Sequence, residues 1–481
     1  MQSAFDLTAD LDTPVSAFLK LAPLQPRFLL ESVDQGDRLG RYSFLGFGPA
    51  HHVRLDTGGL TLDGTAYPHP SGESFAATMR RALALAPVLE PRIPTIPFHG
   101  GLVGLTTYEA VGLLEPRLAG PTPPNHAEDA GRGSEGGEGG EGAQGGNTLL
   151  GSWVAPSSVL VFDHVTRRMA LLHGGTEAER TALAREIKAL LRSPIAVQPT
   201  GSAAPAEESI DRATYCEAVG RVQEYIAEGE VFQLVLASRF RGRSDLDPFQ
   251  VYRALRVLNP SPYLYYVALP DLAVVGSSPE ALVRLRDGTA TLRPIAGTRP
   301  RGDTAREDRE LERALLDDPK EAAEHVMLVD LARNDLGRVA EPGTIVVEPY
   351  RSVERYSHVM HLVSGVEGRL SRGLDQFDLF AATFPAGTVV GAPKIRAMEL
   401  IRQLEPVPRG GYAGTVGYFG HGEAMDQAIA IRTLLFEDGH YAYQAGAGIV
   451  ADSVPRREYQ EVLAKGAALA AAIRMAAGGL D

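Results

Sequence analysis

The sequence predicts an α+β fold in which the sheet is largely antiparallel and is packed with helices. Residues 26–48 have the pattern of a strand, a Gly/Asp turn and a second strand, and residues 157–162 form a further strand-like run. In the second half, residues 211–228 are spaced like a helix, and strand-like runs follow at 231–239 and 262–269. Because strands and helices mix without a regular βα period or an obvious repeat, we do not expect a doubly wound parallel sheet.

The length of 481 residues exceeds the size at which one compact core usually stops growing, so we expect two domains. Pro, Ala and Ser dominate the stretch before residue 207, which places a linker at 194–210 between a first domain at 1–193 and a second at 211–481. Residues 177–192 have a helical pattern. Residues 125–147 are rich in Gly and Glu and hold almost no apolar side chain, so we expect a disordered surface insert there.

Charge and composition exclude several classes of protein. The net charge of −13 disfavours a nucleic-acid partner, because such proteins usually present a basic face. The chain has no apolar run long enough to span a membrane, and its first residues lack the pattern of a signal peptide. The single cysteine, Cys216, allows no internal disulfide, so we expect a cytoplasmic protein. Cys216 lies in a helical pattern that Asp211 can cap, without the surroundings of a reactive nucleophile.

A first pair of carboxylates lies near the start of a predicted helix. Asp318 and Pro319 are typical of a helix start, with the aspartate as the cap and the proline as the first helical residue. Glu321 and Glu324 then share one face because they are three residues apart. Glu321 also occupies the capping-box position, so a purely structural role is its alternative.

A second pair lies on the predicted C-terminal helix, where Glu458, Glu461 and Lys465 form one stripe. Taken alone, this stripe is typical of a solvated helix face. Carboxylate oxygens are hard ligands suited to Mg²⁺, which takes few protein carboxylates and keeps several waters. Two carboxylate pairs from distant segments therefore suggest a magnesium site.

Two glycine-rich motifs are similar to nucleotide-binding loops, but we do not expect them to act as such. Gly446–Ala451 follows a strand, yet too few residues remain after it for a nucleotide-binding half, and the next helix starts only near Pro455. Gly387–Lys394 departs from the spacing of a phosphate loop, and Pro393 lacks the backbone donor that a phosphate cradle needs.

Five dense motifs follow one another in the second half of the chain. They are Pro294–Gly302, Lys320–Asn334, Phe384–Lys394, Tyr412–Gly414 with Ala430–Arg432, and Gly446–Ser453. Together they resemble the chorismate-utilising enzymes, and within them the large subunits of anthranilate synthases. The resemblance is dense over residues 211–470 and looser over residues 1–120. It implies that family's fold, with antiparallel sheets and helices in two intertwined sub-domains, of which 1–193 is regulatory and 211–481 binds chorismate.

The resemblance implies a reaction in which ammonia adds to ring carbon C2 of chorismate and pyruvate is then eliminated to leave an aromatic ring. The C4 hydroxyl must leave, and hydroxide is a poor leaving group, so an acid has to protonate it. Glu280 matches the family's acid, and its pKa would have to be raised, for instance by burial. His361 matches a histidine tied to pyruvate elimination, and Thr388 matches a hydroxyl that lines the pocket. For the nearby His358, a packed histidine is the alternative to any such role.

The resemblance also implies how the two substrate carboxylates are held. Mg²⁺ on Glu324 and Glu461, supported by Glu321 and Glu458, would hold the ring carboxylate. Arg432 can donate two hydrogen bonds to the enolpyruvyl carboxylate, with a structural ion pair as its alternative. The other positions that match the substrate-binding residues of the family are Gly297, Thr298, Tyr412, Gly446, Ala447, Gly448 and Lys465.

Two positions distinguish among relatives. Gln233 stands where isochorismate-forming enzymes carry a lysine that activates water, which favours ammonia as the nucleophile. Ala296 stands where many aminodeoxychorismate synthases have a lysine, which favours an anthranilate synthase. An aminodeoxychorismate synthase, which retains the pyruvate, and a non-catalytic chorismate-binding regulator stay open as alternatives.

Residues 29–32 and 259–264 resemble the tryptophan pocket of anthranilate synthases, with an ordinary hairpin and an ordinary turn as the alternative. Inhibition by tryptophan is therefore expected. The implied inhibitor contacts are Glu31, Ser32, Pro262, Tyr263 and Leu264, with residues 41–43 nearby.

The source of ammonia is expected to be a partner. Ammonia is mostly ammonium at neutral pH, and Cys216 does not have the surroundings of a glutaminase nucleophile. We therefore expect a separate glutamine amidotransferase subunit.

Overall fold

The computed structural model describes residues 7–8, 11–32, 40–67, 74–119, 147–196, 200–355 and 359–480. His358 and all but the last residue of the predicted insert at 125–147 lie outside the described residues, so what was expected of them stays a prediction. Within the described ranges, no helix has the length and apolar content needed to cross a membrane.

Residues 7–196 supply two long strands, several shorter ones and four helices in the part that is described. The strands are β1 (Leu7–Thr8), β2 (Pro26–Glu31), β3 (Tyr42–Asp56), β4 (Gly59–Leu62), β5 (Thr65–Tyr67), β6 (Gly101–Thr106), β7 (Leu149–Asp163) and β8 (Arg168–His173), and the helices are α1 (Pro14–Lys20), α2 (Phe75–Leu85), α3 (Val111–Leu114) and α4 (Glu177–Leu191).

Residues 200–480 supply the remaining strands and most of the helices. The first strands are β9 (Glu207–Glu208), β10 (Gln233–Arg243), β11 (Tyr263–Ala268), β12 (Ala273–Ser278), β13 (Ala281–Arg286), β14 (Thr289–Leu292) and β15 (Ile295–Pro300). They are followed by β16 (Val346–Val347), β17 (Ser352–Arg355), β18 (Val359–Val363), β19 (Val366–Arg369), β20 (Gly391–Ala392), β21 (Thr415–Gly420), β22 (Ala424–Ile429), β23 (Thr433–Glu437) and β24 (His440–Ile449). The helices are α5 (Arg212–Ala227), α6 (Pro248–Leu258), α7 (Ala305–Asp317), α8 (Pro319–Gly337), α9 (Gln376–Thr383), α10 (Lys394–Leu404) and α11 (Pro455–Gly478).

One large sheet extends in two directions from β7. In one direction the strands follow the order β3, β2, β11, β12, β23, β24 and β10, and in the other they follow β6, β21, β22, β13, β14 and β19. Each of these pairings is antiparallel, so the predicted α+β fold with antiparallel sheet is confirmed. A separate small sheet pairs β15 with β18 and β18 with β17.

The two halves of the chain are intertwined. Strand β2 pairs with β11, and β6 pairs with β21, so strands from residues 7–196 continue the sheet formed by residues 200–480. They also share a core, in which the Phe98 ring packs edge-on against Phe44 at 5.8 Å and lies 4.7 Å from Tyr418, centroid to centroid. The division into domains at 1–193 and 211–481 stays a prediction. Among the described residues, the large sheet and the core around Phe98 take strands and side chains from both segments.

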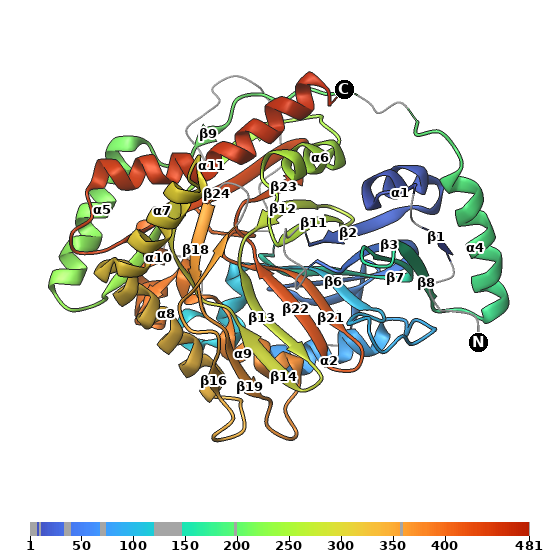
Figure 1. Ribbon diagram of the computed structural model, residues 1–481, viewed down its shortest axis with the longest axis horizontal. Coiled ribbons are helices and arrows are strands. Elements are labelled where there is room, and N and C mark those ends of the chain that lie inside the picture. Colours follow the sequence, from blue (N-terminus) through green and yellow to red (C-terminus); the bar gives the residue numbers. More distant parts are fainter. Residues whose placement is uncertain are drawn as a thin grey trace.

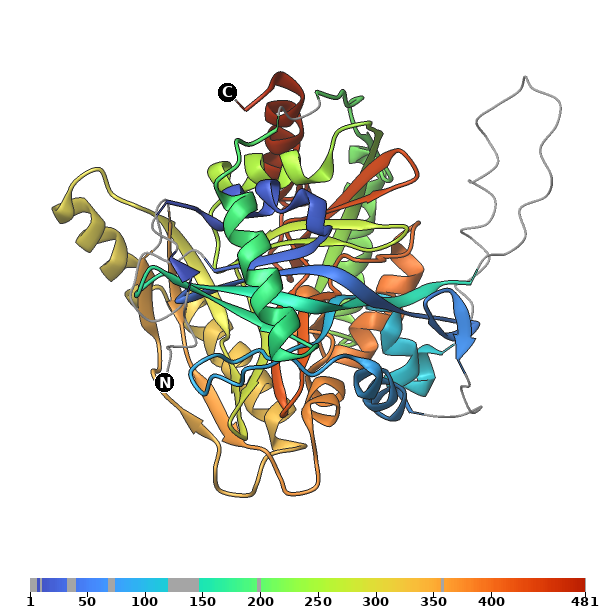
Figure 2. The ribbon, with the colours of Figure 1, turned by 90° about the vertical axis from the view of Figure 1, so that its right-hand side faces the viewer.

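The helices cover the sheet from outside. Helix α4 packs on β8 at one side of the molecule, whereas α5, α8 and α10 lie on the opposite side and α11 runs along the top (Figure 1). Viewed from the α4 side, this helix crosses in front of the long blue and teal strands of residues 42–56 and 149–163 (Figure 2).

The predicted helices form close to their expected bounds. Asp211 caps α5 by accepting a hydrogen bond from the Thr214 N–H at 2.8 Å, and Asp318 caps α8 through the N–H groups of Lys320 and Glu321 at 2.9 and 3.2 Å. Helix α11 begins at Pro455, as predicted. Predictions at helix starts succeed because caps and proline act locally.

The predicted strands are also present, but several bounds differ: β3 ends at Asp56, β7 begins at Leu149 and β10 ends at Arg243. Strand β10 begins at Gln233 rather than Val231, because the Phe232 N–H donates to the Ala392 carbonyl at 2.7 Å and only Gln233 enters the ladder with β20. Gly446 and Gly448 both lie inside β24, so they do not form the strand-to-helix turn of a dinucleotide site.

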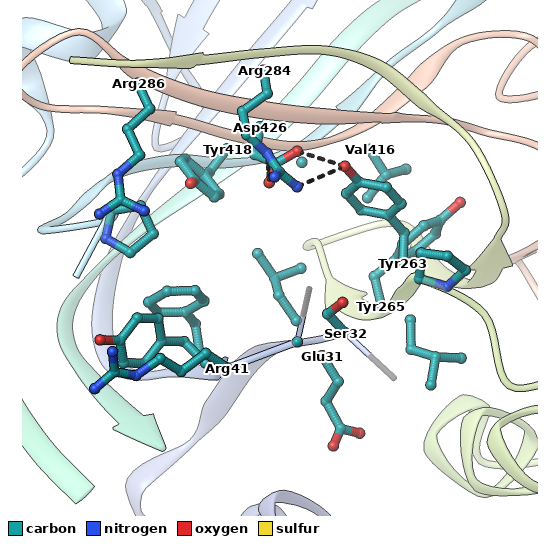
Figure 3. Close-up of a pocket in the computed structure, with 18 of the residues that line it drawn as sticks. Glu31, Ser32, Arg41, Tyr263, Tyr265, Arg284, Arg286, Val416, Tyr418 and Asp426 are labelled. Atoms are coloured by element: carbon teal, nitrogen blue, oxygen red, sulfur yellow. Dashed lines mark hydrogen bonds and ion pairs between the residues drawn. The ribbon is translucent and has the colours of Figure 1, made fainter. Parts of the chain in front are cut away.

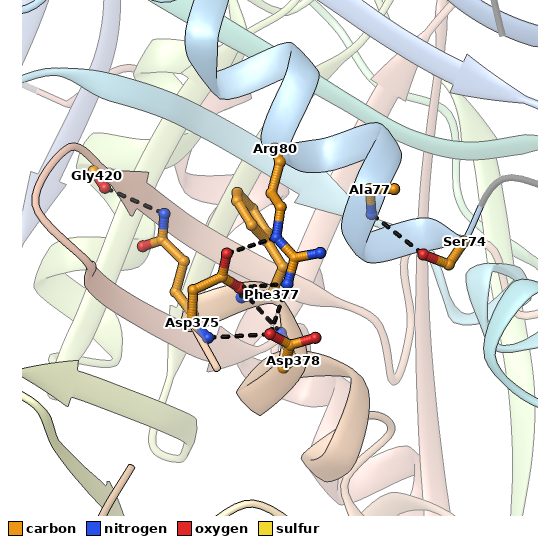
Figure 4. A network of polar contacts seen from close by, with 8 residues as sticks. Ser74, Ala77, Arg80, Asp375, Phe377, Asp378 and Gly420 are labelled. Atoms are coloured by element: carbon orange, nitrogen blue, oxygen red, sulfur yellow. Dashed lines mark hydrogen bonds and ion pairs between the residues drawn. The ribbon is translucent and has the colours of Figure 1, made fainter. Parts of the chain in front are cut away.

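A salt-bridge cluster ties α2 of the first half to α9 of the second. Arg80 lies between Asp375 and Asp378 (Figure 4), and its Nε is 2.6 Å from the nearer carboxylate oxygen of Asp375. Asp375 also caps α9 by accepting from the N–H groups of Phe377 and Asp378. Helix α9, which precedes the 384–393 loop, is therefore held at its N-terminus by a residue that lies 295 positions earlier in the chain.

Candidate active site

Glu280 lies in the short turn between β12 and β13, where it is half-buried. Thr388, on the single helical turn Gly387–Val389, donates its hydroxyl to the Glu280 carboxyl at 3.0 Å. Burial raises the pKa of Glu280 to about 7, although Thr388, Lys465 and Arg432 each oppose the rise. A carboxyl with this pKa is well placed to give up a proton near neutral pH. Glu280 and Thr388 are 108 positions apart, and both were predicted to belong to the site. They are thus in direct contact.

His361, Thr298 and Gly297 form a second group of predicted residues in contact. Thr298 and His361 are paired across β15 and β18. The Nδ1 atom of His361 is 3.1 Å from the Thr298 hydroxyl and 3.1 Å from the Gly297 carbonyl oxygen. Because a carbonyl can only accept, the contact with Gly297 favours the tautomer with the proton on Nδ1, in which Nε2 is unprotonated. Burial lowers the pKa of His361, so the ring is neutral at pH 7.

Gly297 brings this group next to the first carboxylate helix. Its φ is +61°, and a Cβ there would lie 3.0 Å from Glu321 Oε2 and 2.7 Å from a Leu315 methyl group. Arg299 joins the same two elements, because its guanidinium donates to Glu321 at 3.1 Å and to Asp318 at 2.8 Å. Glu321 therefore forms an ion pair with Arg299 of β15 and does not close a capping box. The sequence suggested the capping box but not this ion pair.

The predicted glycine strand lines the site with its backbone. Gly446, Ala447 and Gly448 pair with β10 on one edge of β24, while the pairing of β24 with β23 ends at Tyr443. A Cβ on Gly446 would lie 2.6 Å from the Tyr412 hydroxyl, and a Cβ on Gly448 would lie 2.5 Å from the Gln233 amide nitrogen. Only glycines leave room for these two polar groups to reach the strand.

Arg432 carries a charge that no residue in the described part of the chain pairs. Its guanidinium has no hydrogen-bond or ion-pair partner among the described residues, and burial lowers its pKa while Tyr412, Glu461 and Glu280 oppose this. Its backbone is left-handed, with φ of +52°, a conformation that is costly for a non-glycine residue and is often found at functional sites. The structural ion pair considered for Arg432 is therefore not formed with any described residue. A deep guanidinium without a partner is a ready site for an anion.

Lys465 connects the second carboxylate helix to the glycine strand. Its Nζ atom is 2.7 Å from Glu461 and donates to the Gly446 carbonyl at 2.9 Å. Burial raises the pKa of Glu324 and of Glu458, and the positive charge of Lys465 opposes part of each rise. Repulsion from Glu321 and Glu461 adds to the rise at Glu324, so the carboxylates of α8 and α11 lie within reach of one another.

The four carboxylates fit a magnesium ion in their chemistry. In the described part of the chain, no three Asp, Glu, His or Cys side chains stand together as a ready-made metal site. Mg²⁺ does not require one, because it often binds through one or two carboxylates and completes its shell with water and substrate. Glu324 has no cationic hydrogen-bond partner among the described residues, whereas Glu461 would have to share its carboxylate with Lys465. The mutual repulsion across α8 and α11 is the feature that a cation would relieve.

A separate cavity of about 510 Å³ collects the residues predicted to bind tryptophan. On one wall, Arg284 donates to Asp426 at 2.9 Å and to the Tyr263 hydroxyl at 3.0 Å, while Arg41 and Arg286 lie at the opposite end (Figure 3). The predicted inhibitor residues Glu31, Ser32, Pro262, Tyr263 and Leu264 all line this cavity.

The Glu31 side chain points away from the cavity (Figure 3). Its carboxylate accepts hydrogen bonds from Tyr252 and from Arg256 of α6, the latter at 2.9 Å. Glu31 therefore anchors β2 to α6 and offers the cavity its backbone, a difference that the sequence pattern could not reveal.

Sequence reasoning missed one residue of the site altogether. Arg409 lies 1% exposed beneath Tyr412, with its guanidinium carbon 5.4 Å from the centre of that ring. Its only sequence signal is its place before the glycine pair Gly410–Gly411. Of the two discriminating residues, Gln233 abuts Gly448 and Ala296 is buried on β15.

Comparisons with known proteins identify the family of this chain. Residues 25–471 match the family described as chorismate binding enzyme. The anthranilate synthase component 1 of Thermus thermophilus is 44% identical over 479 residues, which cover 98% of this chain and 97% of that protein. The protein of the same name from Acinetobacter calcoaceticus is 42% identical over 491 residues, with 98% and 95% covered.

Solved structures share the fold. The crystal structure of anthranilate synthase component I from Streptococcus pneumoniae has a TM-score of 0.76 at 32% identity, over 96% of this chain and 98% of that one. The menaquinone-specific isochorismate synthase of Escherichia coli has a TM-score of 0.67 at 21% identity, over 96% and 92%, which is a likeness of fold. The resemblance that the five motifs indicated is confirmed.

The raised pKa of Glu280 predicts a pH-dependent effect of Glu280→Gln on stability. The carboxyl ionises near 4.5 when unfolded and near 7 when folded, so the stability of the wild type falls as pH rises between these values. The neutral glutamine does not suffer this loss. We expect Glu280→Gln to be more stable than wild type at pH 8, by up to about 3 kcal/mol, and to show little of this gain below pH 4.5.

Denaturant unfolding of both proteins at the two pH values measures this difference. Thr388→Val is the matched control, and it should be less stable than wild type at pH 8, because the hydroxyl favours the ionised carboxylate. Equal effects of Glu280→Gln at both pH values would contradict a pKa near 7.

Proposed function

This chain belongs to the chorismate binding enzymes, and from that membership we propose that it is the synthase subunit that converts chorismate and ammonia into anthranilate and pyruvate. The observation that carries the proposal is that two groups lie within electrostatic reach of each other. They are a protonatable carboxyl, Glu280, and a guanidinium that has no ion-pair partner among the described residues, Arg432. The relatives named anthranilate synthase component 1 support the choice of product.

In this proposal the substrate is held by its two carboxylates. Arg432 and the Tyr412 hydroxyl bind the enolpyruvyl carboxylate, and the backbone of Gly446–Gly448 presents further donors. The Arg432 guanidinium and the Tyr412 hydroxyl have no hydrogen-bond partner among the described residues and lie within electrostatic reach of each other, so both can bind an anion without first breaking a hydrogen bond. Glu324 and Glu461, with Glu321 and Glu458, would hold Mg²⁺, which would supply positive charge for the ring carboxylate.

The first step is substitution at the ring. Ammonia forms a bond to C2, the double-bond electrons shift, and the bond from C4 to its hydroxyl breaks. Glu280 gives its proton to the departing hydroxyl, which leaves as water, and Thr388 stabilises the resulting carboxylate. The pKa of about 7 keeps part of the Glu280 population protonated when the reaction begins.

The second step makes the ring aromatic. The proton at C2 is removed and pyruvate leaves by cleavage of its ether bond to the ring. We assign proton removal to Nε2 of His361, which is neutral and whose Nδ1 atom is held by Gly297 and Thr298. Gly297 and Thr298 therefore act by fixing the histidine as well as by lining the pocket.

The two discriminating residues favour this reaction over those of relatives. The Gln233 amide adjoins Gly448 and cannot activate water as a lysine would. Ala296 leaves space on β15 where a lysine would place a charge. An aminodeoxychorismate synthase, which retains the pyruvate, remains the second candidate.

Regulation and partner are part of the same proposal. The 510 Å³ cavity combines aromatic walls with three arginines and Asp426, a chemistry that suits an aromatic amino acid such as tryptophan. Cys216 is a half-buried helix residue on α5, so we propose that a glutamine amidotransferase subunit delivers the ammonia. A cytoplasmic location stays a prediction.

Product identity tests the proposal. The purified chain is incubated with chorismate, Mg²⁺ and ammonium at alkaline pH, and anthranilate is followed by its fluorescence. We expect anthranilate with ammonium but not with glutamine, loss of activity on chelation, and a Mg²⁺ requirement raised roughly tenfold or more in Glu324→Gln. Glu310→Gln, on the exposed face of α7, carries the same charge change and should behave as wild type.

Each other outcome has a meaning. Accumulation of aminodeoxychorismate without anthranilate would identify the second candidate. Absence of any chorismate turnover would overturn the proposed function.

Tryptophan should inhibit the wild type and raise its melting temperature, because a ligand that binds the folded state stabilises it. Ser32→Phe places a ring in the 510 Å³ cavity and should abolish both effects while leaving activity without tryptophan. Thermal shift and initial rates with tryptophan or alanine measure this. Full inhibition of Ser32→Phe would show that tryptophan acts elsewhere.

A further inference from the structure

Arg409 and Glu405 form a buried ion pair directly behind the candidate active site. Their side chains are 1% and 5% exposed. The guanidinium donates two hydrogen bonds to the carboxylate, at 2.9 and 2.6 Å. Such a pair needs further hydrogen bonds to offset the cost of removing both charges from water.

Those further bonds go to the backbone of the site. Arg409 donates to the Val389 carbonyl at 2.7 Å and to the Val235 carbonyl at 2.8 Å, and Glu405 accepts from the Ala237 N–H at 2.9 Å. Val389 directly follows Thr388, and Val235 is paired with Gly448 across β10 and β24. One guanidinium thus fixes both the turn that carries Thr388 and the strand behind the substrate glycines.

The same guanidinium lies between two aromatic rings. Its carbon is 5.0 Å from the centre of the Tyr108 ring and 5.4 Å from that of Tyr412. Stacking of this kind holds a ring at a defined height and angle. Tyr412, which is expected to meet the substrate, is therefore supported from below by Arg409.

We propose that Arg409 is a positioning residue that holds the Gly387–Val389 turn so that the Thr388 hydroxyl reaches Glu280, and that supports Tyr412 at the same time. The inference rests on the proposed function, because it takes Glu280 as the acid. Its chemistry requires an arginine. A planar fork can serve a carboxylate and two carbonyls at once, whereas an ammonium group on a flexible stem cannot reach all three.

A direct consequence concerns the acid. Thr388 lowers the pKa of Glu280, as do Lys465 and Arg432, which are the charged groups that face it. If the turn loosens, the Thr388 contact is lost and the pKa of Glu280 rises. The pH above which the acid is no longer protonated then moves upward.

The test is the pH profile of anthranilate formation at constant free ammonia, measured for wild type, Arg409→Lys, Thr388→Val and the double variant. We expect the falling limb of kcat to move up by about one pH unit in Arg409→Lys and in Thr388→Val, because a hydrogen bond to a charged group is lost in both. The double variant should match Thr388→Val alone. KM for chorismate should also rise in Arg409→Lys, since Tyr412 loses its support.

Arg402→Lys is the matched control. This residue is on α10, and its guanidinium donates to the Leu118 carbonyl at 2.8 Å, away from the Thr388 turn. Its falling limb should coincide with that of wild type. A shift in Arg402→Lys equal to that in Arg409→Lys would attribute the effect to general loosening and overturn the proposal.

Two further outcomes overturn the proposal. The first is a folded Arg409→Lys protein whose limb does not move, and the second is a double variant whose shift is the sum of the single shifts. If Arg409→Lys does not fold, Glu405→Leu with Arg409→Met removes both charges together, and the same readout applies to it. A wild type that makes no anthranilate would instead reject the proposed function, so the two failures are distinguishable.

Discussion

Charge that is held deep in the protein without a full set of partners is the constraint around which this molecule is organised. Arg432 has no ion-pair partner among the described residues, and the carboxyl of Glu280 rests on a single hydroxyl. Both arrangements cost free energy, because burial disfavours the charged form of each group. A dianionic substrate bound with a cation would relieve the strain at Arg432, which is what a site tuned to bind its ligand requires.

The antiparallel sheet supplies the rigidity that such a site needs. Glu280, Arg432 and the Gly446–Gly448 strand come from β12–β13, β22–β23 and β24, which belong to one continuous set of ladders. Strand β13 also reaches the distant cavity, where Arg284 and Arg286 line the wall. The acid directly precedes the strand that lines the proposed inhibitor cavity, which gives a physical route by which occupation of the cavity can alter the acid. Arg409 and Glu405 complete this scaffold from behind.

Local chemistry explains which features the sequence could predict. Asp318 and Pro319 start α8 through contacts within four residues, and the period of strand residues marks β7, β10 and β11 without knowledge of the fold. The motif resemblance then indicated which residues share the site. It could not indicate that Glu31 turns toward α6, that Arg299 takes up Glu321, or that Arg409 underlies Tyr412. These arrangements depend on side-chain direction and on contacts between distant segments, which only the packed structure determines.

The most direct test of the account is whether Arg432 binds the substrate. Calorimetric titration of chorismate with Mg²⁺ into Glu280→Gln, which should bind without turnover, is compared with the same titration into Glu280→Gln/Arg432→Met. The exposed Arg306→Met change in the Glu280→Gln background serves as the control. The account predicts that affinity falls roughly 30-fold or more without Arg432, because a buried charge-assisted contact is lost. Equal affinity in the two proteins would contradict it.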